Sequence, residues 1–489
     1  MKTGSFVAGD WYSPDTGKTI RNINPANTDD IIAEFGAAGS DDTERAVAAA
    51  MEAFDSWSKV PGPERGRLLW RTVEVARRRA DEIAAMMTRE IGKVQAEARG
   101  ETAKGINVLE YYAGEGFRIE GRTSPSEVRD TFVCTIRRPI GVVGAITPWN
   151  FPWAIACWKI APALVAGNTV VFKPASITPG TASLLVECFE EAGVPPGVLN
   201  MIVGSGATAG QRLVEHKAVR ALSFTGSNGI GMALCDTAAA RGAKVTCEMG
   251  GKNAVVVLAD ADIDKAASAI ASGGFGGTGQ RCTATSRVIA HPDVVDALLE
   301  ALVGKAQALK IGDPADPTVT MGPAADAEQL KTDLDYIAIA RAEGARLVHG
   351  GGRPAGLDMG YFVEPTIFCD VDPGMRVFQE EIFGPVVAVS TAQDFDEAIR
   401  MANAVEYGLS AAIFTSDINK AMRFIEGVEV GMVHVNEPTI GGEAQLPFGG
   451  TKATGVGDRE MAKEGLNFYT EIKTVFINYS ASSERTMIR

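Results

Sequence analysis

The chain has 489 residues, which is long for one globular core, so two or more packed domains are expected. It is 46% hydrophobic and 22% charged, as globular proteins are, and its net charge of -14 disfavours a polyanionic partner such as nucleic acid. The N-terminus lacks the apolar run of a secretory signal, and no stretch approaches the roughly 20 apolar residues of a membrane span. We therefore expect a cytoplasmic protein with neither nucleic-acid nor membrane partners.

The seven cysteines are scattered along the chain without a CxxC pair, and their odd number leaves at least one of them unpaired. A reducing compartment fits this pattern best. The four histidines do not have the spacing of metal ligands, so no metal site is expected.

The first hundred residues are predicted to be helical. Apolar residues recur at helical spacing from Val47 to Trp57, and Ser40 can cap the helix that they define. Pro63 opens a second helix with a basic face, which is expected to run to about Ile91.

From Ile140 onward the pattern changes to short β-rich runs, most of them separated by segments of helix length. This alternation predicts an α/β fold with a doubly wound parallel sheet, in which ligands lie beyond the carboxyl ends of the strands. A further alternation, from Gly273 to about Gly431, predicts a second α/β domain. The strands predicted first are Gly141–Ile146, Thr169–Lys173, Asn200–Val203, Ala221–Phe224, Val245–Cys247 and Ala254–Leu258.

Two strand candidates stand apart from these alternations, Val128–Arg137 and Ile472–Ile477. Each would be an apolar edge strand in a monomer, and such edges are usually covered or paired. We expect the two segments to meet at a subunit interface. A solvated surface hairpin is the alternative.

Four loops that follow predicted strands carry residues suited to ligand binding. Asn150, between two prolines, can donate a hydrogen bond to a developing oxyanion, although it can also be a structural turn residue. Lys173 can meet a ribose hydroxyl or a phosphate, or be a solvated surface charge. The turns Gly204–Gly210 and Phe224–Gly231 precede helices whose N-termini can hold a pyrophosphate.

Two further loops carry candidate catalytic groups. Glu248 stands beside two glycines, which leave open space in front of a water-activating carboxylate; a solvated loop glutamate is the alternative. Cys282 follows a glycine-rich run that begins at Gly276, and its small and polar neighbours suit a reactive nucleophile. Positive charge lowers a thiol pKa below its usual value of about 8.5, and Arg281 or the nicotinamide ring of an oxidised cofactor can supply that charge.

Together these residues resemble the aldehyde dehydrogenase superfamily, and the resemblance runs nearly end to end. The motifs occur in the family's order and close to its spacing, so the set is highly specific although each motif alone is common. The matching segments are Pro148–Asn150, Lys159, Lys173, Gly226–Gly231, Glu248–Lys252, Gly279–Cys282, Glu381–Pro385 and Pro447–Gly450.

The resemblance implies that Cys282 attacks the aldehyde carbon, while the Asn150 amide and the Cys282 backbone N–H hold the oxyanion. Hydride then passes to the nicotinamide of NADP+ or NAD+, which leaves a thioester, and Glu248 activates the water that hydrolyses it. Lys159 is implied to be a lysine of the catalytic neighbourhood. The residues implied to bind the cofactor are Ile146, Thr147, Trp149, Lys173, Ser176, Gly206, Ser227, Met249, Glu381 and Phe383.

The fold that the resemblance implies has three parts, and members of the family are usually dimers or tetramers. The dinucleotide-binding domain would comprise residues 1–118 and 139–250, and the catalytic domain residues 251–450. A small β oligomerisation segment would comprise residues 119–138 and 470–489.

One departure from the family pattern bears on the cofactor. Strictly NAD-dependent relatives often have Glu where this chain has Ser176, and its carboxylate accepts hydrogen bonds from the adenosine ribose. The absence of that charge makes room for a 2'-phosphate beside Lys173. We therefore expect NADP+ to be used well, with NAD+ as the alternative cofactor.

The other departure bears on the substrate. Several relatives with Arg at the position of Arg281 act on aldehydes with an anionic tail, and a guanidinium suits carboxylate binding. Succinate-semialdehyde enzymes often have Arg where this chain has Gly276, and this difference disfavours succinate semialdehyde as the substrate. The segments Gln280–Arg287 and Glu443–Pro447 are similar to enzymes that oxidise 2-oxoglutarate semialdehyde, which is the expected substrate.

Several alternatives remain open. Arg281 can equally form a structural salt bridge or serve only to lower the thiol pKa, and the substrate can be succinate semialdehyde or a broad range of aldehydes. In one group of relatives, CoA and not water releases the acyl group from the thioester. These relatives typically lack the glutamate at the position of Glu248, so its presence here favours hydrolysis. A non-enzymatic member usually loses the nucleophile or the base, whereas this chain retains Cys282, Glu248 and Asn150.

Overall fold

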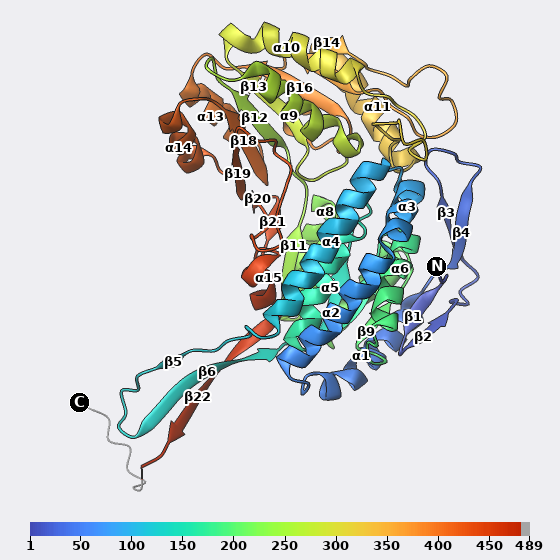
Figure 1. Cartoon of the computed structure of the whole chain (residues 1–489), viewed down its shortest axis with the longest axis vertical. Coiled ribbons are helices and arrows are strands. Elements are labelled where there is room, and N and C mark those ends of the chain that lie inside the picture. The colour runs from blue at the N-terminus through green and yellow to red at the C-terminus, as the bar shows by residue number, and fades with distance from the viewer. Residues whose placement is uncertain (481–489) are drawn as a thin grey trace.

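The computed structural model describes residues 1–480, whose strands form two large sheets and three small ones. Figure 1 shows a lower body that contains the eight-stranded sheet, an upper body that contains the seven-stranded sheet, and an arm that projects from the lower body. The grouping of these parts into domains stays a prediction.

The sheet of the lower body has a parallel centre and antiparallel edges. Its strands are β1 (Ser5–Val7), β2 (Asp10–Tyr12), β7 (Val142–Ile146), β8 (Thr169–Lys173), β9 (Leu199–Met201), β10 (Val219–Thr225), β11 (Lys244–Glu248) and β21 (Gly455–Val456). The spatial order is β2-β1-β9-β8-β7-β10-β11-β21, and the five strands from β9 to β11 are parallel. The order reverses between β7 and β10, and the crevice at such a switch point is where doubly wound sheets bind ligands.

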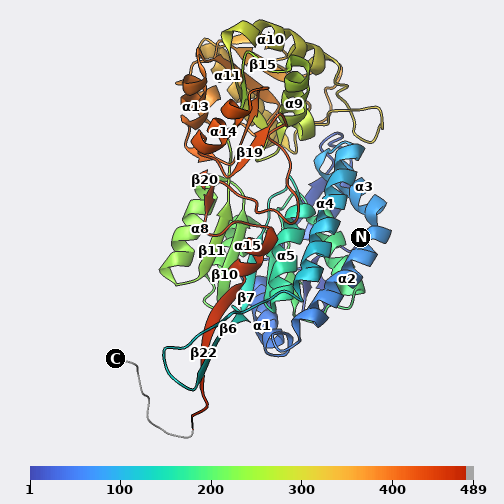
Figure 2. The ribbon, with the colours of Figure 1, turned by 60° about the vertical axis from the view of Figure 1, so that its left-hand side comes forward.

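Helices cover both faces of this sheet. They are α1 (Ser40–Trp57), α2 (Gly62–Arg78), α3 (Ala80–Ile91), α4 (Gln95–Glu115), α5 (Ala154–Ala166), α6 (Pro179–Glu191), α7 (Gln211–Glu215) and α8 (Asn228–Ala240). Apolar residues of α2 to α6 pack into one core, whereas those of α1, α7 and α8 pack into another on the opposite face. In Figure 2, α5 and α8 lie on opposite sides of the strands. Every residue of α5 is buried. The predicted doubly wound α/β fold is confirmed.

The N-terminal segment departs from the helical prediction. Residues 5–36 form β1, β2 and a hairpin of β3 (Thr19–Ile23) with β4 (Ile31–Gly36). β1 pairs with β9, almost 200 residues later, so its conformation is set by a long-range partner that local pattern does not reveal. The N-cap of α1 is Gly39, and Ser40 is its first helical residue.

The predicted long helix from Pro63 to Ile91 is also wrong, because α2 and α3 are separated at Arg79. The Arg79 guanidinium forms ion pairs with Glu82 and with Glu187 on α6. These contacts hold the break against the rest of the lower body.

The upper body is a second α/β unit. Its strands are β12 (Asn253–Val257), β13 (Thr285–Ala290), β14 (Arg346–His349), β15 (Thr366–Cys369), β16 (Val386–Thr391), β18 (Ser410–Phe414) and β19 (Met432–Val435), and its helices are α9 (Ile263–Phe275), α10 (Pro292–Gln307), α11 (Ala327–Ala342), α12 (Arg376–Gln379), α13 (Phe395–Asn403) and α14 (Ile418–Gly427). The spatial order is β14-β15-β16-β13-β12-β18-β19, and only β14 is antiparallel to its neighbour. The second alternation thus begins at β12, and not after Gly273 as predicted.

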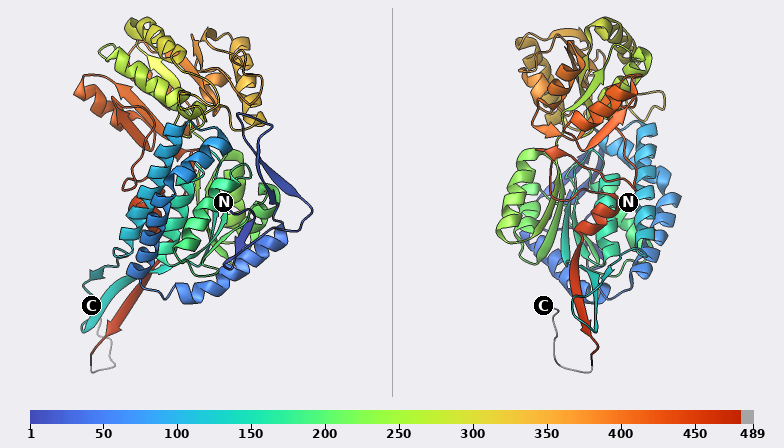
Figure 3. Two further views of the ribbon diagram at one scale, coloured as in Figure 1. Left: turned by 45° about the vertical axis from the view of Figure 1, so that its right-hand side comes forward. Right: turned by 90° about the vertical axis from the view of Figure 1, so that its left-hand side faces the viewer.

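The chain returns to the lower body after β19 and then forms the arm. A short pair of β17 (Tyr407–Gly408) with β20 (Thr451–Lys452) precedes α15 (Ala462–Phe468). The arm joins β22 (Thr470–Asn478) to β6 (Thr131–Pro139), with the short β5 (Thr123–Ser124) beside β6, and it stands clear of both bodies in Figure 3. The two strands predicted to stand apart therefore pair with each other.

None of the helices in residues 1–480 combines the length and apolar character that a membrane crossing requires. In the same part of the chain, no three His, Cys, Asp or Glu side chains are grouped so that they could hold a metal ion.

Candidate active site

Three of the four predicted catalytic residues, Asn150, Glu248 and Cys282, lie at the junction of the two bodies. Asn150 follows β7 and Glu248 ends β11, so both lie at the carboxyl edge of the lower sheet. Cys282 lies between the 3-10 turn Gly276–Gly279 and β13 of the upper sheet. The only residues between β11 and β12 are Met249 to Lys252, which bring the two sheets close together here.

The loop that carries Cys282 is fixed by hydrogen bonds from both bodies. The Asn253 side chain donates to the carbonyl oxygens of Cys282 and Ala284, at 2.8 Å each. The Asn150 Nδ2 atom donates to the carbonyl oxygen of Gln280 at 3.2 Å. A Cβ atom at Gly251 would lie 2.5 Å from the Cys282 carbonyl oxygen, so only glycine fits there. The predicted oxyanion donor thus reaches the loop of the predicted nucleophile.

The charges around Cys282 act on its thiol in opposite directions. Burial, together with the carboxylates of Glu381 and Glu248, raises the pKa of Cys282 to about 12, whereas Lys104 acts to lower it. The sequence analysis proposed Arg281 as a cation that lowers the thiol pKa, but Arg281 forms an ion pair with Glu97 at 2.8 Å. The cation that acts on the thiol is therefore Lys104.

One cavity opens on the side of Cys282 that faces the lower sheet. Its volume is about 230 Å³, and it brings together seven of the predicted residues. These are Trp149, Asn150, Ser227, Met249, Cys282, Glu381 and Phe383. The rings of Trp149 and Phe383 meet edge to face with centroids 5.4 Å apart. We call this space the cofactor-side cavity.

Among residues 1–480, Glu381 is the only charged residue in the wall of that cavity. It accepts a hydrogen bond from the Gly251 N–H at 2.8 Å, and burial raises its pKa to about 7. A Cβ atom at Gly250 would lie 2.2 Å from a Glu381 carboxylate oxygen, so the two glycines leave room for this carboxylate.

The other predicted cofactor residues lie along the same sheet edge but outside the wall of the cavity. Ile146 and Thr147 end β7 and begin the next loop. Lys173 is buried, which lowers its pKa to about 8, and its ammonium donates to the carbonyl oxygen of Pro174 at 2.8 Å. Ser176 donates to the carbonyl oxygen of Gly204 at 3.3 Å.

This edge has features that fit a dinucleotide. Within the described chain, the buried hydroxyls of Thr147 and Thr225 have no hydrogen-bond partner. Gly206 and Gly229 stand at the first turns that follow β9 and β10, and a Cβ atom at either would meet only open space. A helix N-terminus with open backbone in front of it is suited to a phosphate.

Glu248 lies beside the site without lining either cavity at Cys282. It is buried, and its Oε2 atom has no hydrogen-bond partner in the described chain. Burial and the nearby Glu460 carboxylate raise its pKa well above the ordinary value. A Cβ atom at Gly449 would lie 2.3 Å from its Oε1 atom, so glycine is required where the carboxylate packs.

Lys159 lies deeper, on α5. Its ammonium is fully buried, forms an ion pair with Glu460 and donates to the Ser223 hydroxyl at 2.9 Å. Glu460 also accepts a hydrogen bond from the Trp158 indole at 2.8 Å. Lys159 therefore stands behind the site as one half of a buried ion pair.

A second cavity opens on the other side of Cys282, with a volume of about 440 Å³. We call it the aldehyde-side cavity. Of the predicted site residues it contains only Arg281 and Cys282. Its other charged and aromatic wall residues were not predicted as site residues, although Phe448 lies in the matching segment Pro447–Gly450. These residues are Lys93, Glu97, Glu101, Lys104, Phe151, Trp158 and Phe448.

Part of that wall has a signal in the sequence. Glu97, Glu101 and Lys104 recur at intervals of four and three residues on α4, which places them on one face of the helix. A stripe of charge on a helix usually indicates a solvated surface, and only the fold shows that this one faces Cys282.

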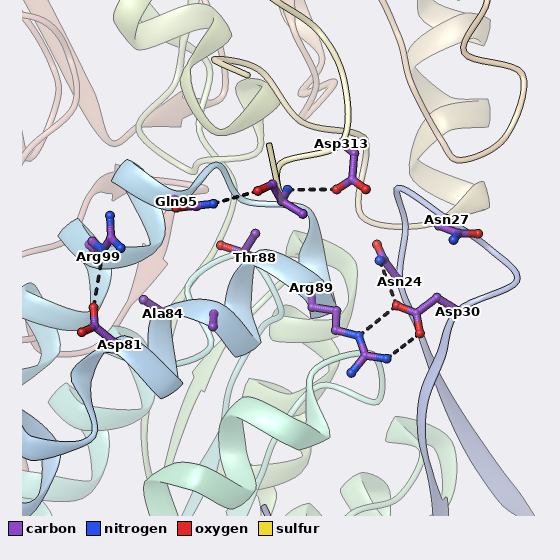
Figure 4. Close-up of a pocket in the computed structure, with 12 residues that line it drawn as sticks. Asn24, Asn27, Asp30, Asp81, Ala84, Thr88, Arg89, Gln95, Arg99 and Asp313 are labelled. Atoms are coloured by element: carbon purple, nitrogen blue, oxygen red, sulfur yellow. Dashed lines mark hydrogen bonds and ion pairs between the residues drawn. The ribbon is translucent and has the colours of Figure 1, made fainter. Parts of the chain in front are cut away.

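A cavity of about 500 Å³ lies away from Cys282, where α3 and α4 meet the β3–β4 connection (Figure 4). Its cations are paired, since Arg89 contacts Asp30 and Arg99 contacts Asp81. None of the predicted site residues lines it.

Comparison with known proteins agrees with this geometry. Residues 11–475 match the aldehyde dehydrogenase family. The chain is 46% identical over 475 residues to an alpha-ketoglutaric semialdehyde dehydrogenase of Bacillus subtilis, with 97% of each chain covered. It is 44% identical to an alpha-ketoglutarate semialdehyde dehydrogenase of Haloferax volcanii and 42% identical to a 2,5-dioxopentanoate dehydrogenase of Saccharolobus solfataricus, with 97% of this chain and 99% of the relative covered in each case.

Solved structures give the same result. A betaine aldehyde dehydrogenase of Staphylococcus aureus, in complex with NAD+, superposes with a TM-score of 0.96 at 35% identity, covering 98% of this chain and 95% of the other. A crystal structure described as a putative aldehyde dehydrogenase, from Burkholderia cenocepacia, superposes with a TM-score of 0.96 at 36% identity, covering 99% and 100%. The chain therefore belongs to the aldehyde dehydrogenase family and is an NAD(P)-dependent oxidoreductase that oxidises an aldehyde.

Proposed function

We propose that the chain oxidises 2-oxoglutarate semialdehyde to 2-oxoglutarate. The observation that carries this proposal is the excess of cationic side chains in the aldehyde-side cavity, beside Cys282. An aldehyde with a carboxylate at its far end is complementary to such a wall. Three relatives that are 42 to 46% identical to this chain are named for oxidation of this aldehyde, and they support the same substrate.

In the proposed reaction, the Cys282 thiolate attacks the aldehyde carbon, and the oxyanion is held by the Asn150 amide and the Cys282 N–H. An oxidised nicotinamide held in the cofactor-side cavity by Trp149, Glu381 and Phe383 would supply the hydride acceptor. Glu248 then activates the water that releases the acid from the thioester, for which its unpartnered Oε2 atom is free. Lys159 helps to position the lower wall of the site through its ion pair with Glu460.

The proposed cofactor is NADP+, with NAD+ as the second choice. Its phosphates would lie at the turns that begin at Gly206 and Ser227, and its riboses beside Lys173 and Glu381. Support comes from Ser176, whose short neutral side chain leaves the neighbourhood of Lys173 without a carboxylate that would repel a 2'-phosphate.

We also propose that the arm forms a subunit interface, in a dimer or a tetramer. Its strands expose large apolar side chains to an extent that is unusual for a free edge: Phe132 is 46% exposed, Ile472 62% and Phe476 67%. Light scattering of the purified chain distinguishes monomer, dimer and tetramer.

We further propose that residues 1–118 and 139–250 form the domain that binds the cofactor, and that residues 251–450 form the domain that carries the nucleophile.

The test of the substrate is an initial-rate comparison at 340 nm with NADP+ and NAD+ in parallel. The panel contains 2-oxoglutarate semialdehyde, succinate semialdehyde, pentanal and benzaldehyde. The proposal expects the highest kcat/KM for 2-oxoglutarate semialdehyde. A higher value for pentanal or benzaldehyde would show that the cationic wall does not select the substrate, and would reject it.

A further inference from the structure

The charged residues of the aldehyde-side cavity do not balance. Three cations, Lys93, Lys104 and Arg281, share its wall with two carboxylates, Glu97 and Glu101. Opposite charges in a partly buried site are expected to pair, because an unpaired buried charge is costly. Which cation remains after pairing identifies the group that is free to bind an anionic ligand.

The Glu101 carboxylate contacts Lys93 and the N-terminus of α5. It is almost completely buried and forms an ion pair with the Lys93 ammonium through Oε2. Its Oε1 atom accepts the backbone N–H groups of Trp153 and Ala154 at 3.0 and 3.1 Å, at the N-terminus of α5. Both oxygens are thus occupied, and Lys93 is neutralised.

The Glu97 carboxylate contacts Arg281 and the backbone of the loop that carries the nucleophile. Its Oε1 atom accepts the Gly277 N–H at 2.7 Å and the Arg281 guanidinium at 2.8 Å. This pair ties α4 to the glycine-rich turn before Cys282. The charge of Arg281 is therefore balanced, and its side chain is held in a structural contact.

Lys104 is the cation that remains. In the described part of the chain, no carboxylate lies within ion-pair distance of its ammonium, and no hydrogen bond to it occurs. The ammonium lies 5.4 Å from the centre of the Trp158 ring, and it would be 3.4 Å from a Cβ atom at Gly442. Burial lowers the pKa of Lys104, as expected for an ammonium that lacks an anionic partner.

We propose that Lys104, and not Arg281, binds the distal carboxylate of the aldehyde substrate. This inference rests on the proposed function and names the residue that gives it specificity. The carboxylate occupies the place of the missing counter-ion beside the Lys104 ammonium, the alkyl chain crosses the apolar wall of Phe151 and Phe448, and the aldehyde reaches Cys282. Arg281 then serves to hold the nucleophile loop through Glu97.

The test compares Lys104→Met with Arg281→Met, each of which replaces a cation by a long apolar side chain. For each, the ratio of kcat/KM for 2-oxoglutarate semialdehyde to that for pentanal is measured. A hydrogen bond to a charged group is worth roughly a 10- to 100-fold effect, so Lys104→Met is expected to lower this ratio about 10- to 100-fold. Arg281→Met is expected to lower it by less than about threefold, although it can slow both substrates. The exposed Lys217→Met is the matched control, with an unchanged ratio.

A second measurement does not depend on turnover of the semialdehyde. Glutarate, a carboxylate-bearing dead-end ligand, should inhibit pentanal oxidation by the wild-type chain, and its inhibition constant should rise about 10-fold or more in Lys104→Met. Lys104→Arg should restore part of the inhibition, since it returns a cation. Thermal unfolding and cofactor binding show whether each variant is folded.

The outcomes separate the two proposals. If wild type prefers pentanal, the proposed substrate fails, and the inference falls with it. If wild type prefers the semialdehyde but Lys104→Met keeps both the ratio and the glutarate inhibition, the proposed substrate is retained and the proposed role of Lys104 is rejected. A ratio that collapses in Arg281→Met instead would assign the anion to Arg281.

Discussion

The two cavities that meet at Cys282 differ in the sign and number of their charges. The cofactor-side cavity has one charged residue, the carboxylate Glu381, among aromatic, amide and glycine neighbours. Within the described chain, the aldehyde-side cavity has five charged residues, of which Lys104 alone has no ion-pair partner. The thiol therefore lies where a negative field from one side meets a positive field from the other. A cationic nicotinamide ring and an anionic aldehyde each meet the complementary charge.

The most severe way to break this arrangement is to remove the Cys282 thiol, which lines both cavities. Cys282→Ala should lower turnover at least about 10⁴-fold, because nothing else in the walls can form the thioester. Cofactor binding, followed by fluorescence titration, should persist because Trp149, Ser227 and Glu381 are intact. Residual activity above about one per cent of wild type would contradict the assigned nucleophile.

The next largest effect is expected from Glu248→Gln. Loss of a general base lowers the rate about 10²- to 10⁴-fold. A rapid-mixing experiment should still give a burst of reduced cofactor, because thioester formation does not need this base. If the burst disappears together with turnover, Glu248 acts before the thioester.

The pH dependence of wild type has a defined sign. The pKa of Glu248 is raised, so its carboxylate is protonated and inactive at low pH and becomes the active base as pH rises through that raised pKa. Thioester hydrolysis should therefore accelerate with pH. In Glu248→Gln, the rate of this step should depend less on pH, which single-turnover measurements can detect.

Ser176→Glu extends the negative charge of the cofactor side toward Lys173. A carboxylate there should repel a 2'-phosphate and accept hydrogen bonds from a ribose. The ratio of kcat/KM for NADP+ to that for NAD+ is expected to fall roughly 10- to 100-fold. An unchanged ratio would show that the 2' position of the cofactor lies elsewhere, and Ser176→Thr serves as the neutral control.

The smallest expected effect comes from the aldehyde side. Glu97→Gln removes a negative charge and leaves Arg281 without its partner, so the thiol pKa should fall. A decrease of about half a pKa unit would increase the rate of alkylation by iodoacetamide about threefold at fixed pH. A slower reaction would mean that loss of the Gly277 contact displaces the loop more than the charge change activates it.

Local patterns were enough to predict the parts of the site that follow buried strands. β7 begins one residue after the predicted start and ends at the predicted Ile146, which places Trp149 and Asn150 in the loop where ligands bind. The glycine-rich run before Cys282 was equally local. Here the strand, the turn and the functional residue lie within about ten positions of one another.

The rest could not be predicted because it depends on contacts between distant parts of the chain. Strand β1 is held by β9, and Arg281 is held by Glu97, 184 positions away. From the sequence, Arg281 could bind the substrate, lower the thiol pKa or form a structural salt bridge, and only the packing of α4 against the loop identifies the salt bridge with Glu97. The same packing reveals Lys104, which no motif marks.

The ion pair of Lys159 with Glu460 has a consequence for biosynthesis. Lys159 lies inside the lower body, but its partner Glu460 is made about 300 residues later. Until Glu460 has left the ribosome, the core around α5 must either hold an ammonium without a counter-charge or remain partly open, and an unpaired buried charge is strongly destabilising. A chain that ends before β21 lacks Glu460, so we expect it to be less stable and more readily cut by proteases than the longer chain.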